Sequence, residues 1–134
     1  MYLGIDWGAK KIGLAVGDDF TRVAVPWLIA KNLAEVLKLL NQEAIDVIVV
    51  GEPKHLAGKS DSKDFAKFLT ELKSRTKLPI ELIDERLSTR MANRLGYDKT
   101  MTVGQNKKVK KGDDAVAAML ILQTFLDRQS YGSN

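Results

Sequence analysis

The stretch of residues 2–18, which reads YLGIDWGAKKIGLAVGD, constrains the fold more than any other part of the chain. Two short apolar segments, residues 3–5 and 12–16, flank a turn that contains glycine. This pattern predicts two antiparallel strands that form a hairpin. The chain must therefore build the rest of its sheet around this hairpin.

Asp6 ends the first of these two strands, and three glycines surround it. An ionised carboxylate headed for the core is costly to bury unless it is paired or holds a cation. Gly4, Gly8 and Gly13 remove side chains where a phosphate backbone or another strand could approach closely. Asp6 is therefore either a metal ligand that faces a phosphate or a strand-end aspartate that closes a turn through its own backbone.

The next elements are a strand, a helix and a second strand. Residues 23–29 predict a third strand, and Pro26 within it indicates a sheet edge, where a missing amide donor is harmless. Asn32 is suited to cap a helix whose apolar residues follow at i, i+3, i+4 and i+7. The sequence IDVIVV at residues 45–50 is typical of a central parallel strand covered on both faces.

The second half of the chain repeats this alternation. We expect a helix over residues 62–76, a strand over 80–83, and a short helix capped by Ser88 or Thr89 and closed by Gly96. A nearly all-apolar helix at 115–126 must pack against the sheet. The prediction is a single α/β domain over residues 1–134, with a five-stranded mixed sheet in the order βββαβαβα.

The amino-acid composition excludes several kinds of functional site. The 134 residues contain no cysteine, which excludes a disulfide framework, a thiol nucleophile and a cysteine-based zinc site. No segment has the pattern of a signal peptide, and no apolar run approaches the length of a membrane span. We therefore expect a cytoplasmic protein with no membrane partner.

The positive charge is unevenly distributed. The net charge is +4, and the whole excess lies in residues 68–134, which contain twelve basic and eight acidic residues. The densest basic run consists of Lys107, Lys108, Lys110 and Lys111, in a stretch that we interpret as a mobile loop. It suits an anionic partner such as nucleic acid, although a solvated lysine loop is as common for a run this short.

Acidic residues end several of the predicted strands. Right-handed crossovers place the carboxyl ends of the parallel strands at one sheet edge, which gathers Asp6, Glu52 and the pair at 84–85. Asp113 and Asp114 begin the last helix; one of them caps it, and the other is free to face the same cluster. Such hard carboxylate oxygens favour Mg²⁺ or Mn²⁺, and a pair of ions could support phosphodiester cleavage.

Four motifs together resemble the YqgF family, whose members are described as pre-16S rRNA nucleases and Holliday junction resolvases with an RNase H-like fold. The resemblance covers essentially the whole chain. Its motifs are Asp6-x-Gly8-x-Lys10-Lys11-Ile12-Gly13, Gly51-x-Pro53, Leu78-Pro79-Ile80 followed by Asp84-Glu85-Arg86-Leu87-Ser88-Thr89, and Asp114-x-x-Ala117-Ala118-x-x-Ile121-Leu122-Gln123.

The resemblance implies an acidic site made of Asp6, Glu85 and Asp114, with Mg²⁺ or Mn²⁺ as cofactor. Whether Asp84 or Glu85 is the ligand stays open, because side chains alternate along a strand. Glu52 stands where the family usually has an apolar residue, and is either an extra ligand or an exposed substitution. Lys11 replaces the family's usual arginine, which keeps the charge and loses the bidentate fork.

Nucleic acid is the partner that this site and the basic residues imply, either a ribosomal RNA precursor or branched DNA. The rival hypothesis is a binding module that has kept the fold without cleaving. A junction resolvase requires a homodimer to cut two strands, whereas an rRNA nuclease can act as a monomer. The residues that we expect to bind phosphates are Lys10, Lys11, Arg86, Lys107, Lys108, Lys110 and Lys111.

Overall fold

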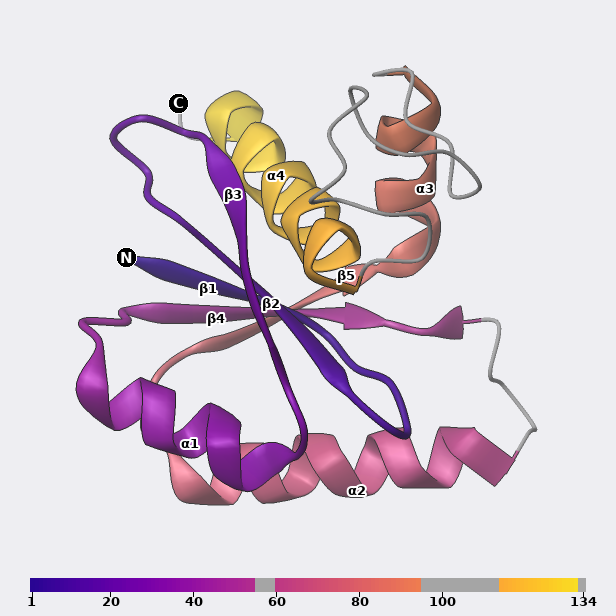
Figure 1. The fold of residues 1–134 in the computed structure, drawn as a ribbon. Coiled ribbons are helices and arrows are strands. Elements are labelled where there is room, and N and C mark those ends of the chain that lie inside the picture. The colour runs from indigo at the N-terminus through magenta and orange to yellow at the C-terminus, as the bar shows by residue number, and fades with distance from the viewer. Residues whose placement is uncertain (55–59, 95–113, 133–134) are drawn as a thin grey trace.

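A computed structural model describes residues 1–54, 60–94 and 114–132. Within these residues the chain forms one five-stranded sheet and four helices (Figure 1). The elements are β1 (Tyr2–Asp6), β2 (Ile12–Gly17), β3 (Ala24–Ala30), α1 (Leu33–Gln42), β4 (Val47–Glu52), α2 (Ser60–Arg75), β5 (Ile80–Asp84), α3 (Glu85–Arg94) and α4 (Asp114–Gly132).

The sheet has the strand order β3-β2-β1-β4-β5. The first three strands pair antiparallel, whereas β4 pairs parallel to β1 and β5 pairs parallel to β4. The predicted mixed sheet is therefore confirmed. So is the edge position of the strand that contains Pro26, because β3 ends the strand order.

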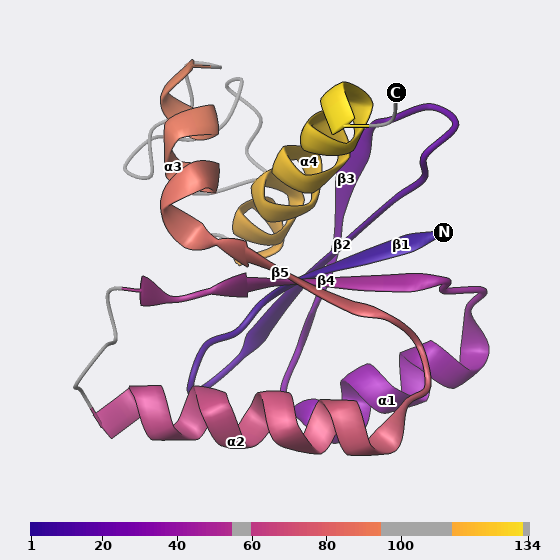
Figure 2. The ribbon, with the colours of Figure 1, turned by 180° about the vertical axis from the view of Figure 1, so that it is seen from behind.

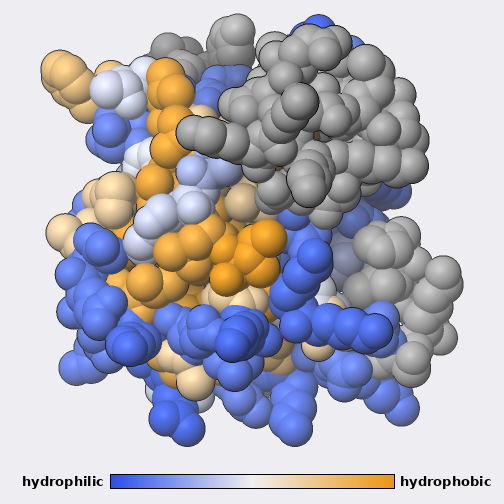
Figure 3. All heavy atoms as spheres, in the orientation of Figure 1, coloured by the Kyte–Doolittle hydropathy of each residue, from blue (hydrophilic) through white to orange (hydrophobic). Residues whose placement is uncertain are grey.

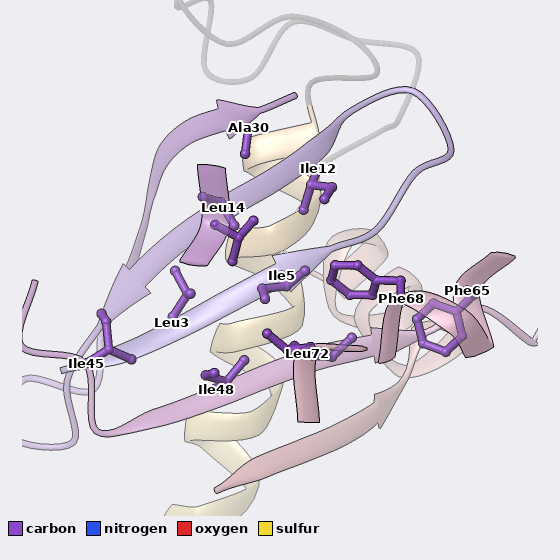
Figure 4. Packing of buried hydrophobic residues seen from close by; sticks show 12 residues of the cluster. Leu3, Ile5, Ile12, Leu14, Ala30, Ile45, Ile48, Phe65, Phe68 and Leu72 are labelled. Carbon is purple, nitrogen blue, oxygen red and sulfur yellow. The ribbon is translucent and has the colours of Figure 1, made fainter. Parts of the chain in front are cut away.

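Helices cover both faces of this sheet (Figures 1 and 2). On one face, a core forms between the sheet and the helices α1 and α2, with Leu3 and Ile5 of β1 fully buried. Figure 4 shows Ile5 pointing toward Phe68 of α2, with Leu72 nearby and Leu3 farther along the strand. On the other face, α4 packs its own apolar side chains on the sheet.

The side chains of β1 thus alternate between two cores. Leu3 and Ile5 belong to the α1–α2 side, and a β-carbon at Gly4 would lie 2.8 Å from the Leu122 β-carbon of α4. This alternation defines which face each neighbouring side chain occupies. It is the basis for locating the acidic side chains below.

The first helix begins where the sequence predicts. Asn32 caps α1, since the backbone N–H of Glu35 donates to its side chain at 3.0 Å. The Asn32 backbone is extended, as is usual for a residue that precedes a helix. The amide side chain therefore satisfies one of the free backbone donors in the first turn.

The start of α3 corrects a prediction. Ser88 and Thr89 are not caps, because α3 begins at Glu85 and both hydroxyls donate to the Glu85 backbone oxygen. Asp84 takes the capping role instead, accepting the Arg86 backbone N–H at 2.9 Å. The predicted closing residue of this helix, at position 96, lies outside the described residues.

Figure 3 shows one face of the molecule, where hydrophobic side chains gather in the middle above a mostly hydrophilic lower part. Val25 and Ile29 of β3 are exposed, and Pro26 between them removes one amide donor from this edge strand. Such a proline hinders pairing of the edge with another strand. Among the helices that the structure describes, none is long and apolar enough to cross a membrane.

Candidate active site

Asp6 lies at the carboxyl end of β1, in the middle of the sheet. It pairs with Gly13 across the antiparallel ladder, and the residue before it pairs with Val50 of β4. Because Gly4 faces α4 and residues i and i+2 share a face, the Asp6 side chain also lies on the α4 side. Asp6 is half-buried there.

Asp114, the first residue of α4, lies against Gly13. A β-carbon at position 13 would lie 1.9 Å from the Asp114 backbone oxygen and 2.7 Å from its β-carbon. Since Gly13 is the cross-strand partner of Asp6, the start of α4 is brought beside that carboxylate. We expected a phosphate backbone or another strand to approach closely at Gly13. In the structure, the first residue of α4 occupies this space.

The Lys11 ammonium lies close to this pair, with its Nζ 3.7 Å from the Asp114 Oδ2. Lys10 and Lys11 are both exposed in the turn between β1 and β2. The structure therefore places Lys11 beside the acidic edge. The N-terminus of α4 also favours a carboxylate at position 114 through the helix dipole.

Glu52 and Asp84 lie on the opposite face of the sheet. A β-carbon at Gly51 would contact Ile121 of α4, and Gly51 pairs with Ile83, which is buried against the same helix. The following pair, Glu52 and Asp84, therefore faces the α2 side.

Salt bridges on that face engage both carboxylates. The Lys54 Nζ lies 2.9 Å from the Glu52 Oε1. The Arg86 Nε lies 3.0 Å from both carboxylate oxygens of Asp84. These hydrogen bonds, joined by the charge of Lys54, lower the pKa of Asp84 from 3.8 to about 2. Arg86 is thus held by Asp84, and Glu52 is turned away from Asp6.

Glu85 follows Asp84 as the first residue of α3, which packs beside α4. It is half-buried. Because Asp84 is turned to the other face and bound by Arg86, Glu85 is the candidate ligand of this pair. Among the residues that the structure describes, however, no group of three or more acidic or histidine side chains is arranged to hold a metal ion.

Several predicted site residues lie outside the described ranges. They are Asp113, Lys107, Lys108, Lys110 and Lys111. The predicted site residues that the structure describes are therefore Asp6, Glu85, Asp114, Lys10, Lys11 and Arg86.

A mixed sheet in this order, with one helix crossing its centre and carboxylates at the carboxyl ends of its strands, defines an α/β domain of the RNase H-like class. A solved structure, "T. thermophilus RuvC in complex with Holliday junction substrate", has the same fold, with a TM-score of 0.62 and 16% identity over 98% of this chain and 96% of that one. The chain belongs to the RuvX family, described as "Holliday junction resolvase", which it matches over residues 1–128.

Curated relatives cover nearly the whole chain. A protein of Maridesulfovibrio salexigens is 34% identical over 135 residues, which span 94% of this chain and 97% of the relative. A protein of Endomicrobium trichonymphae is 32% identical, with 96% of each chain covered. Both bear the name "Putative pre-16S rRNA nuclease". These matches confirm the resemblance to the YqgF family.

Proposed function

We propose that this chain is a divalent-metal-dependent endonuclease that hydrolyses phosphodiester bonds, with the 5′-end processing of pre-16S rRNA as its activity. The observation that carries the proposal is the contact of Gly13 with Asp114, which sets a second carboxylate beside Asp6. A pair of clustered carboxylates is costly for folding unless a cation compensates it. The family and the names of the relatives agree with this chemistry.

The donor set suits a hard divalent cation. Asp6, Glu85 and Asp114 offer only carboxylate oxygens, which match Mg²⁺ or Mn²⁺. When bound, such an ion or pair of ions supplies charge stabilisation at the phosphate and an activated water. Because these three described side chains do not form a ready cation cluster, the proposal requires their carboxylates to close around the ion when it binds.

The lysines beside the carboxylates have a different task in this proposal. Lys10 and Lys11 are exposed at the turn next to Asp6 and can attract a phosphate backbone to the acidic edge. The Lys11 ammonium near Asp114 reduces the repulsion between the carboxylates before an ion binds. Arg86 stays a proposed phosphate contact, and its guanidinium group is engaged by Asp84 at the same time.

Holliday junction resolution is the second candidate. The description of the family and the similarity to RuvC support it. The two candidates differ in assembly, since a resolvase acts as a symmetric dimer and an rRNA nuclease can act as a monomer. We place either activity in the cytoplasm.

Incubating the wild-type chain with a pre-16S rRNA fragment and with a four-way DNA junction, each in Mn²⁺, tests the proposal. We expect metal-dependent cleavage of the RNA and no product with Asp6→Asn, which keeps the side-chain shape but removes one charge. Equal cleavage by both proteins would indicate another site or a contaminant. Binding without cleavage of any substrate by the wild type would replace the nuclease with a binding module.

A further inference from the structure

A groove between α3 and α4 carries a separate concentration of positive charge. Its volume is about 570 Å³, and its basic lining residues are Arg90 and Arg94 of α3 and Arg128 of α4. Asp127 is the acidic residue of the lining, and the Gln123 Nε2 already donates to its carboxylate at 3.0 Å. Three guanidinium groups against one carboxylate make this groove electropositive.

These arginines are not used to hold the fold together. All three are exposed, and in the described part of the chain no salt bridge joins any of them to a carboxylate. This contrasts with Arg86 on the same helix, α3, which Asp84 engages. A planar guanidinium group without a carboxylate partner is suited to bind phosphate through two parallel hydrogen bonds.

The walls of the groove are held in place by packing. Met91 and Ala92 of α3 are buried against Val116 and Leu120 of α4. The Thr124 hydroxyl donates to the Leu120 backbone oxygen at 2.7 Å, and its oxygen lies 3.6 Å from the Met91 sulfur. Figures 1 and 2 both show the two helices side by side. The arginines are therefore presented on fixed helices rather than on a loop.

A neighbouring groove along the free edge of β5 is less suited to an anion. Its lining contains Arg22 and Arg128 but also the acidic residues Asp19, Glu81 and Asp84, of which Asp84 turns its carboxylate toward Arg86 on the other face. It shares Leu87 and Arg128 with the α3–α4 groove. The α3–α4 groove therefore has the more positive lining of the two and is the better site for a polyanion.

We infer that the α3–α4 groove binds the sugar-phosphate backbone of the substrate at a distance from the cleaved bond, an inference that rests on the proposed function. Arg90 and Arg94 lie five and nine residues beyond Glu85, or about 7 and 14 Å along the helix at 1.5 Å per residue. At about 3.4 Å per base pair, this corresponds to phosphates about two to four nucleotides from the acidic site. The groove therefore responds to the length of the nucleic acid rather than to its sequence.

The test compares wild type with Arg90→Ala/Arg94→Ala in binding to labelled duplexes, without divalent metal, by fluorescence anisotropy. One duplex extends about ten base pairs on each side of the cleavage site, and the other about two. We expect the double variant to bind the long duplex several-fold more weakly, with the slope of log K against log salt reduced by about 1.8. The short duplex reaches the phosphate near Arg90 but not the one near Arg94, so the double variant should weaken its binding less.

Two further variants keep the test decisive. Lys38→Ala/Lys73→Ala removes two exposed charges from α1 and α2 on the opposite face and should leave both affinities unchanged. Arg90→Lys/Arg94→Lys keeps the charge and should therefore preserve the salt slope. It should still bind the long duplex more weakly than the wild type, because lysine cannot form the two parallel hydrogen bonds of a guanidinium group.

The results separate the two hypotheses. If Arg90→Ala/Arg94→Ala binds the long duplex as the wild type does, or loses affinity equally for both duplexes, the proposed role of the groove is wrong. The nuclease proposal is not affected by that result as long as the wild type cleaves its substrate. Failure of the wild type to bind or cleave any nucleic acid would overturn the proposed function itself.

Discussion

Gly13 of β2 lies directly against Asp114, the first residue of α4, with no space between them for a side chain. Asp6 pairs with Gly13 across the antiparallel ladder. Because Gly13 has no side chain, Asp114 can lie close to Asp6, the other carboxylate of the candidate site. This contact links the packing of α4 to the chemistry at the sheet edge.

Gly13→Ala should therefore damage both stability and activity. The added β-carbon would meet backbone atoms of Asp114, which cannot rotate away as a flexible side chain could. We expect a loss of about 1–3 kcal/mol in the free energy of unfolding and a larger loss of cleavage than of binding. Urea unfolding together with a cleavage assay measures both effects. Unchanged cleavage by a fully folded variant would show that the position of Asp114 does not matter.

The pKa of Asp84 gives a prediction that needs no substrate. The hydrogen bonds from the Arg86 guanidinium lower this pKa from 3.8 to about 2. Because the pKa is lower in the folded than in the unfolded state, the stabilisation by this ion pair is complete above a pH of about 4 and is lost as the pH falls through about 2. Carboxyl-carbon NMR should give this midpoint in the wild type and a higher value in Arg86→Ala, which stays below 3.8 because the backbone N–H of residue 86 and the charge of Lys54 remain. A wild-type midpoint at the ordinary value would mean that the ion pair does not form in solution.

Neighbouring residues 84 and 85 should respond differently to loss of charge. Glu85→Gln removes a proposed ligand and should reduce cleavage by more than about a hundredfold. Asp84→Asn changes a side chain on the other face, which is bound to Arg86, and should keep most of the activity. Single-turnover cleavage rates of the two variants compare these roles. A larger loss with Asp84→Asn would reverse the assignment.

The sequence was sufficient to predict the sheet, because a hairpin, a β-branched central strand and Pro26 leave few arrangements open. It also predicted that acidic residues would meet at the carboxyl edge. The sequence could not show that Glu52 and Asp84 lie on the opposite face of the sheet from Asp6, because the face of a strand-end residue depends on the strand register. The contact of Gly51 with Ile121 reveals this register in the structure. The α3–α4 groove was missed because its arginines come from two helices that are distant in the sequence.

Mn²⁺ binding to the purified chain, followed by electron paramagnetic resonance, tests the central claim most directly, since it does not depend on the choice of substrate. Asp6→Asn and Asp114→Asn should each weaken Mn²⁺ binding by about ten- to a hundredfold. Glu52→Gln should bind Mn²⁺ as the wild type does, because the Glu52 carboxylate pairs with Lys54 on the opposite face. Unchanged Mn²⁺ affinity in Asp6→Asn, or a loss of affinity in Glu52→Gln alone, would contradict a metal site at Asp6, Glu85 and Asp114.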